Sequence, residues 1–217
     1  TSRVFSTYTA EGIAMLAEGV NPALIENAAR MAGMPVGPLA VTDEVTIELA
    51  YKIGKETAAA QGREYPNDAA STAICKMLEE LDRKGKRFGK GFYDYPAGAT
   101  KHLWPGLADE FPVAAKHPPV DELKKRFLVI QALETARCVE EGVITHAEDA
   151  DVGSIFGWGF PPYTGGTLSY IDTLGIGAFV AECDRMAERY GDRFRASDGL
   201  RERAAASAPY YSCGAQP

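Results

Sequence analysis

Few side chains of this chain have the types and spacing that catalysis requires. Glu11 and Glu134 each lie among apolar residues of a helical pattern, where a carboxylate is suited to general-base catalysis or to bonding a backbone or helix N-terminus. We favour the structural role, because the same carboxylate recurs at both positions. His146 stands near Asp149 and Asp151 beside a helix-start pattern, so we interpret this group as a solvated helix start.

Two loops rich in proline and glycine are better candidates for a binding site. Residues 34–38 (Met-Pro-Val-Gly-Pro) and residues 159–166 (Gly-Phe-Pro-Pro-Tyr-Thr-Gly-Gly) each form a turn that opens a helix. A helix N-terminus favours an anion or a polarised carbonyl, and the alternative is interhelical packing. Four basic residues, Lys84, Lys86, Arg87 and Lys90, cluster at the end of an expected helix. The helix dipole favours cations there, and phosphate binding is the alternative role of the cluster.

Composition narrows the class of protein. The chain has 217 residues, 46% of them hydrophobic, and a net charge of −7, which argues against nucleic acid or an anionic membrane as partner. No stretch approaches the roughly 18 apolar residues of a spanning helix. The four cysteines, Cys75, Cys138, Cys183 and Cys213, form no CxxC pair, which favours free thiols in a cytoplasmic setting. The three histidines, His102, His117 and His146, lack the spacing of metal ligands, so no metal is expected.

The elements that must position these groups come in two similar copies. Segments 3–20 and 126–143 match at constant spacing, and further on segments 33–43 and 159–172 match with small insertions. The paired residues are Arg3 with Arg126, Glu11 with Glu134, and Gly19 with Gly142. A repeat of this length is a supersecondary unit, and two such units usually bury matching faces against each other.

The periodicity predicts helices and almost no strands. In the first copy the expected helices are residues 2–18, residues 22–31, one that begins at Pro38 and one that ends at Gly85. The helix from Pro38 is expected because Val41, Val45, Leu49 and Ile53 repeat every four residues. In the second copy we expect a helix opened by a Thr145–Glu148 capping box, one from about Gly166, and one over residues 176–190. Residues 86–96 are expected to be extended, Trp104 and Phe111 to anchor a connector, and the tail to fray beyond Pro209. No GxGxxG follows a strand and no GxSxG is present, so the chain offers no dinucleotide fold.

The fold class predicted is therefore all-α, with two tandem homologous helical domains packed in pseudo-twofold symmetry. The first domain is expected over residues 1–96, a connector over 97–120 and the second domain over 121–217. Two linked copies can satisfy one interface within a single chain, so we expect a compact monomer.

Several motifs, in order, resemble the C-terminal region of 3-hydroxyacyl-CoA dehydrogenases, most closely the α-subunit of the multifunctional fatty-acid β-oxidation complex, in which this region is duplicated. The resemblance covers Ser2 to about Ala204. The motifs are residues 33–38 with Asp43, 89–95 (Gly-Lys-Gly-Phe-Tyr-Asp-Tyr), 104–111 (Trp-Pro-Gly-Leu-Ala-Asp-Glu-Phe), 126 onward through 157–166, and 190–194 (Tyr-Gly-Asp-Arg-Phe). It implies helical domains of the kind found at the C-terminus of 6-phosphogluconate dehydrogenase.

The resemblance implies an upstream Rossmann domain that binds NAD and carries a catalytic His–Glu pair, while the helical region supplies part of the acyl-CoA pocket. It implies substrate contacts at Ser2, where the family often has asparagine, and at Val36, Gly37 and Pro38. We expect no cofactor, metal or catalytic residue on this chain itself, and no dehydrogenase activity from it alone. Residues 160–166 look like the counterpart of the first loop and are expected to serve packing.

Three functions remain open on the sequence. The leading one is the substrate-closing part of an NAD-linked 3-hydroxyacyl-CoA dehydrogenase, with acyl-CoA as substrate and a thiolase subunit or a homo-oligomer as further partner. The second is a non-catalytic helical module that assembles a β-oxidation complex. The third, a separate acyl-CoA or lipid carrier, is disfavoured because half a pocket buries too little of a ligand.

Overall fold

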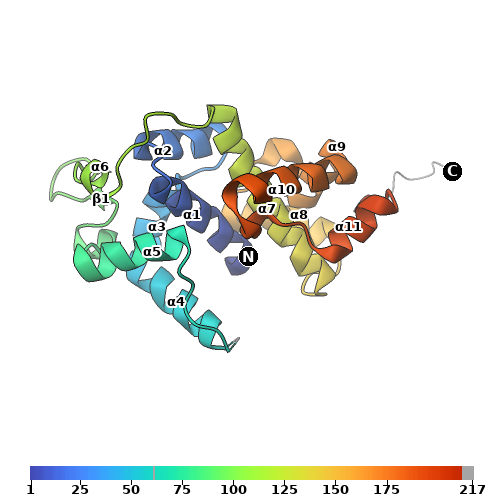
Figure 1. Cartoon of the computed structure of the whole chain (residues 1–217), viewed down its shortest axis with the longest axis horizontal. Helices are drawn as coiled ribbons and strands as arrows, with labels where there is room; N and C mark the ends of the chain where they lie inside the picture. The colour runs from blue at the N-terminus through green and yellow to red at the C-terminus, as the bar shows by residue number, and fades with distance from the viewer. Residues whose placement is uncertain (61, 212–217) are drawn as a thin grey trace. The chain divides into compact units, whose positions relative to one another are not determined.

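The computed structural model describes residues 1–60 and 62–211, and these fold mainly into helices (Figure 1). The first helices are α1 (Ser2–Ala17), α2 (Pro22–Met31), α3 (Pro38–Val45), α4 (Ile47–Ala60), α5 (Ala69–Cys75) and α6 (Leu107–Glu110). The later ones are α7 (Val120–Glu140), α8 (Ala147–Trp158), α9 (Thr167–Leu174), α10 (Ile176–Tyr190) and α11 (Asp198–Ala205). A π-helical turn, η1 (Lys76–Glu80), extends α5. The prediction of an all-α fold is confirmed.

The chain divides into two compact units. One comprises residues 8–31 and 35–124, and the other comprises residues 1–7, 32–34 and 125–217. The division into sequence domains at 1–96, 97–120 and 121–217, and their pseudo-twofold packing, stay predictions. Among the described residues, no helix combines the length and apolar character needed to cross a membrane.

The unit of residues 8–31 and 35–124 contains a helix break that the periodicity did not reveal. The helix expected from Pro38 ends at Val45, and α4 begins at Ile47, because Thr46 between them has a φ of 71°. The N–H of Ile47 donates to the carbonyl of Lys84 at 2.9 Å, so the segment that follows η1 docks at the break. The residues spaced by four do not share a buried face, since Val45, Leu49 and Ile53 are 41%, 47% and 50% exposed.

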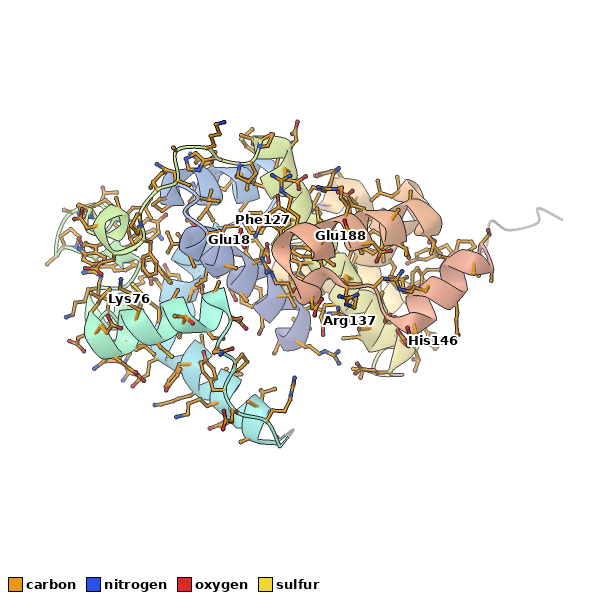
Figure 2. The ribbon with its side chains drawn as sticks, viewed as in Figure 1. Glu18, Lys76, Phe127, Arg137, His146 and Glu188 are labelled. Atoms are coloured by element: carbon orange, nitrogen blue, oxygen red, sulfur yellow. The ribbon has the colours of Figure 1, made fainter. Side chains whose placement is uncertain are left out.

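The same unit holds the only strands among the described residues, in a region expected to be extended or irregular. Strands β1 (Tyr93–Asp94) and β2 (His102–Leu103) pair antiparallel, with Tyr93 opposite Leu103. Phe111 is buried, as expected of an anchor, while Trp104 is half-buried beneath the guanidinium of Arg83, 4.1 Å from its ring. Figure 2 shows Lys76 on η1, and its Nζ lies 2.9 Å from the Glu110 carboxylate.

The other unit is built around α7, whose apolar residues meet those of α9, α10 and α11 in one core. Helix α10 packs against α9 and α11 (Figure 1). The core includes Val129, Leu133, Leu168, Ile171, Phe179, Met186 and Leu200. The capping box predicted at Thr145 is wrong, because α8 begins at Ala147 with His146 as N-cap and no side-chain cap bond.

Candidate functional site

The loop between α2 and α3 is held by a buried carboxylate. Glu26, on the buried face of α2, accepts hydrogen bonds from the N–H of Leu39 at 2.8 Å and of Ala40 at 3.4 Å, at the start of α3. The hydroxyl of Tyr93 donates to its second oxygen at 2.7 Å. Burial raises the pKa of Glu26, while these donors and Arg30 oppose the shift. The helix N-terminus that the sequence offered to an anion is therefore occupied by the chain's own carboxylate.

The expected substrate contacts in this loop are each fixed by a neighbour. The carbonyl of Val36 accepts a 2.6 Å hydrogen bond from the hydroxyl of Tyr8. Gly37 lies so close to Glu26 that a Cβ there would come within 2.3 Å of the carboxylate. Pro38 packs on Gly12, where a Cβ would lie 2.3 Å from its Cγ. The half-buried Val36 and the buried Gly37 and Pro38 form a rigid rather than an adaptable segment.

Ser2 is the first residue of α1 and is exposed. Its carbonyl accepts a hydrogen bond from the Ser6 hydroxyl at 2.8 Å, one turn along the helix. Ser2 belongs to the unit of residues 1–7, 32–34 and 125–217, whereas Val36, Gly37 and Pro38 belong to the other unit. Each is therefore described within its own unit.

The second copy repeats this bracing with a different acid. Asp151 on α8 accepts from the N–H of Leu168 at 2.7 Å and of Ser169 at 3.0 Å, at the start of α9. The hydroxyl of Tyr211 donates to it at 2.7 Å. Asp151 thus does for α9 what Glu26 does for α3. From the sequence, Glu26 was not singled out. The interpretation of Asp151 as part of a solvated helix start is wrong, because Asp151 is 4% exposed and accepts these backbone hydrogen bonds. Each acid lies on the buried face of the helix before its loop.

A second pair of acids anchors the segments that carry the two tyrosines. Asp43 accepts from the N–H groups of Phe92 at 2.9 Å and Tyr93 at 2.8 Å. Asp172 accepts from the N–H groups of Tyr210 at 3.0 Å and Tyr211 at 2.9 Å.

The pKa of Asp43 and the position of the tail both depend on the surroundings of these acids. Burial raises the pKa of Asp43 to about 6, against the opposing effect of its donors and of Arg83. The prediction that the tail frays beyond Pro209 is wrong for Tyr210 and Tyr211, whose N–H groups bind Asp172. Residues 212–217, including Cys213, lie outside the described residues.

The loop that follows α8 contacts residues 32–34, just before the first loop. The hydroxyl of Tyr163 donates to the carbonyl of Ala32 at 3.0 Å. Gly33 has a φ of 103°, and a Cβ there would lie 2.9 Å from Pro161. These contacts support the packing interpretation of residues 160–166, because they brace the chain immediately ahead of Met34.

Glu134 is bound differently from the expectation. Its carboxylate pairs with the guanidinium groups of Arg3 and Arg137, the latter at 2.8 Å, rather than with a backbone or a helix N-terminus. Arg137, labelled in Figure 2, also donates to the carbonyl of Arg195 at 2.8 Å. Hydrogen bonds from Arg3 lower the pKa of Glu141, the other acid that it binds. Glu134 is thus the centre of an ion-pair cluster on α7.

Three of the four members of the basic cluster at residues 84–90 pair with two carboxylates of the chain. Lys86 pairs with Glu44 at 2.7 Å, and Lys84 and Lys90 both pair with Asp82, at 2.9 and 3.0 Å. This pairing weakens the phosphate-binding alternative. Cys75, Cys138 and Cys183 are free thiols. In residues 1–60 and 62–211, no group of three or more His, Cys, Asp or Glu residues could hold a metal ion.

The helical fold matches solved structures of dehydrogenases. It superimposes on 3-hydroxybutyryl-CoA dehydrogenase from Escherichia coli K12 with a TM-score of 0.70 and 20% identity, covering 96% of this chain and 60% of that one. The dehydrogenase part of multifunctional enzyme 1 from C. elegans gives a TM-score of 0.62 and 17% identity, over 93% of this chain and 46% of that one. At these identities the match defines the fold.

Sequence comparison finds a matching family model and longer relatives. Residues 1–95 match the sequence model of the 3-hydroxyacyl-CoA dehydrogenase C-terminal domain. These residues therefore have the sequence pattern of that domain. It is 35% identical over 216 residues to the fatty acid oxidation complex subunit alpha of Shewanella sp. strain MR-7 and 36% identical to that of Shewanella loihica. Each comparison covers 97% of this chain, which spans 30% of the length of those relatives.

Proposed function

We propose that this chain is the substrate-closing part of an NAD-dependent 3-hydroxyacyl-CoA dehydrogenase that acts in fatty-acid oxidation. The observation that carries the proposal is the match of residues 1–95 to the family's C-terminal domain, together with the similarity of nearly the whole chain to fatty acid oxidation complex α-subunits. The reaction is the oxidation of a 3-hydroxyacyl-CoA to a 3-oxoacyl-CoA. The hydride acceptor, NAD, and the catalytic base belong to a Rossmann domain upstream.

The chain's own contribution is a rigid wall of the acyl-CoA pocket. The Val36 carbonyl is oriented by Tyr8, and Gly37 and Pro38 are held by Glu26 and Gly12. A wall fixed before the substrate arrives holds the substrate in a reactive geometry without ordering the loop at each turnover. The exposed hydroxyl of Ser2 supplies a hydrogen-bond donor near the substrate carbonyl in this proposal.

The test uses the natural full-length polypeptide beside the 217-residue chain. With a 3-hydroxyacyl-CoA and NAD, the longer protein forms NADH and the 217-residue chain forms none. In the longer protein, Ser2→Ala lowers kcat/KM about tenfold, the usual range for one lost hydrogen bond to a reacting group. Ser2→Asn, which restores the family's side chain, keeps the activity, and Ser6→Ala, one turn along the same exposed helix face, is the control.

Two outcomes would contradict the proposal. NADH formation by the 217-residue chain alone would show that the catalytic groups lie within it. Equal kcat/KM for Ser2→Ala and Ser6→Ala would remove Ser2 from the pocket.

A helical assembly module is the second candidate. The hydrogen bond from Tyr163 to Ala32 and the close approach of Pro161 to Gly33 support it, since both place residues 160–166 against another segment of the chain. Substitutions in residues 160–166 distinguish the two candidates. The assembly module predicts that such a variant disrupts assembly of the oxidation complex, including any thiolase subunit or homo-oligomer, while hydride transfer continues at its normal rate.

A further inference from the structure

An exposed apolar face lies along α8. Its two large side chains, the α8 pair, are Val152 and Phe156, which lie one turn apart and are 57% and 86% exposed. Gly153 lies beside them, and a Cβ there would have no neighbour within 4 Å. A phenylalanine in water next to bare helix backbone gives a surface that a partner can approach closely, and such surfaces mark interaction sites.

The repeated fold does not require this face. Glu26 and Asp151 hold equivalent positions, because each caps the helix that follows its loop. Counting on from these acids, the α2 positions that correspond to the α8 pair hold Asn27 and Met31. Asn27 is exposed, so the first copy carries a polar amide where the second has valine. Met31 is apolar and 61% exposed, so the copies differ at Val152, which completes an apolar pair on α8 only.

The first residue of the chain lies at this face. The Cγ2 atom of Thr1 is 3.4 Å from the position of a Cβ on Gly157, the residue after Phe156. This chain spans 30% of the length of the relatives that it matches, and the model that matches residues 1–95 is that of a C-terminal domain, which supports further polypeptide ahead of Thr1 in this proposal. Such polypeptide would join Thr1 immediately beside Phe156, at high effective concentration for this surface.

We propose that the α8 face formed by Val152, Gly153 and Phe156 is the docking surface for the polypeptide that precedes Thr1 in the full-length protein. This proposal rests on the proposed function, since it requires the upstream part. The partner surface that fits this face has an apolar centre. Glu148 and Asp149, which are exposed in the first turn of α8, favour basic residues at the edge of that partner surface.

The test measures how fast a thiol at the face reacts with a maleimide. Gly153→Cys, which leaves Val152 and Phe156 in place, is made in a background with Cys75→Ser and Cys213→Ser, because Cys138 and Cys183 are buried. In the full-length protein the thiol at position 153 should react about tenfold more slowly than in the 217-residue chain, as expected for a face covered about nine-tenths of the time. Val143→Cys, at a position that is 68% exposed in the same unit, is the control and should react equally in both.

A second variant separates docking from misfolding. Val152→Asn places on α8 the side chain that α2 exposes at Asn27, so the fold tolerates it. In the full-length protein this change should bring labelling at position 153 back towards the rate of the 217-residue chain. Unchanged protection in Val152→Asn would show that the α8 pair does not hold the partner.

Three further outcomes would overturn the proposal. One is equal labelling of position 153 in the full-length protein and the 217-residue chain. Another is protection within the 217-residue chain that grows with its concentration, which would assign the face to a second copy. The last is a natural protein with nothing before Thr1.

The readout does not depend on activity. Protection at position 153 in a full-length protein that oxidises no 3-hydroxyacyl-CoA would contradict the proposed function and leave the docking surface standing. Oxidation of a 3-hydroxyacyl-CoA without protection of the thiol would support the proposed function and contradict the docking surface.

Discussion

Tyr211 donates a hydrogen bond to Asp151 at 2.7 Å, the distance at which Tyr93 binds Glu26 in the first copy. In each copy the tyrosine comes from a late segment of chain and the acid from the helix before the loop. The two carboxylates each cap the next helix as well. The repeat that is visible in the sequence therefore extends to the hydrogen bonds that hold each loop, although the acid is glutamate in one copy and aspartate in the other.

The tyrosine bridges should contribute measurably to stability. Tyr93→Phe removes the hydroxyl that donates to the second oxygen of Glu26 and should lower the free energy of unfolding by about 1–2 kcal/mol. Tyr211→Phe should cost less, about 0.5–1 kcal/mol, because the same oxygen of Asp151 keeps the N–H and the hydroxyl of Ser169 as donors. Urea denaturation of the 217-residue chain measures this. Tyr51→Phe is the control, because its bond to Glu79 at 3.2 Å is exposed and should be worth less than about 0.5 kcal/mol. Equal effects at all three tyrosines would show that the bridges carry no special weight.

The sequence predicted those parts of the fold that depend on local patterns. Helix α10 occurs at the predicted residues 176–190, and α2 ends at Met31, because apolar periodicity and caps decide such elements. The break at Thr46 was missed, since nothing in a run of well-spaced apolar residues marks a positive φ. The docking of residues 84–85 against the break is a contact between segments distant in sequence.

The candidate site shows the same limit. The loop at Val36, Gly37 and Pro38 was identified from its proline and glycine residues, but the side chains that hold it were not. Glu26 reaches the loop from the preceding helix, and Tyr93 reaches Glu26 from 67 residues further along the chain. Only the fold brings such residues together. Aligning the buried faces of α2 and α8 is the one signal that pairs Glu26 with the acid of the second copy.

Gly37 should not tolerate a side chain. In Gly37→Ala the new methyl group would lie within 2.5 Å of the Glu26 carboxylate, which is fixed by Tyr93 and by α3. Overpacking at such a site costs about 1–3 kcal/mol, and a displaced Glu26 adds the loss of the α3 cap. The matched control is Gly153→Ala on the open side of α8, which should stabilise the chain by about 0.5–1 kcal/mol through helix propensity. Thermal unfolding of both variants measures these effects. If Gly37→Ala left the free energy of unfolding unchanged, the loop would be able to move away from the new methyl group.

The ion-pair cluster on α7 should be strongest at its buried member. Glu134→Gln leaves Arg3 and Arg137 without their shared carboxylate, which is largely buried, and should cost about 1–3 kcal/mol. Glu141→Gln removes the exposed partner of Arg3 and should cost clearly less, with most of that loss absent at high salt. Urea midpoints at low and high salt compare the two variants. A larger loss at Glu141 than at Glu134 would reverse the assignment.

Asp43 should make stability depend on pH in a direction unusual for a carboxylate. Burial raises its pKa from 3.8 to about 6 in the folded chain, so between these values the folded state holds a proton that the unfolded state releases. The free energy of unfolding must therefore fall as pH rises from about 4 to about 6, by up to about 3 kcal/mol from this group. Asp43→Asn cannot titrate, so the advantage of the native chain over the variant should shrink by that amount between about pH 4 and about pH 7. Urea denaturation at a series of pH values gives the difference, and a difference that stays constant or widens with pH would show that the bonds from Phe92 and Tyr93 outweigh burial.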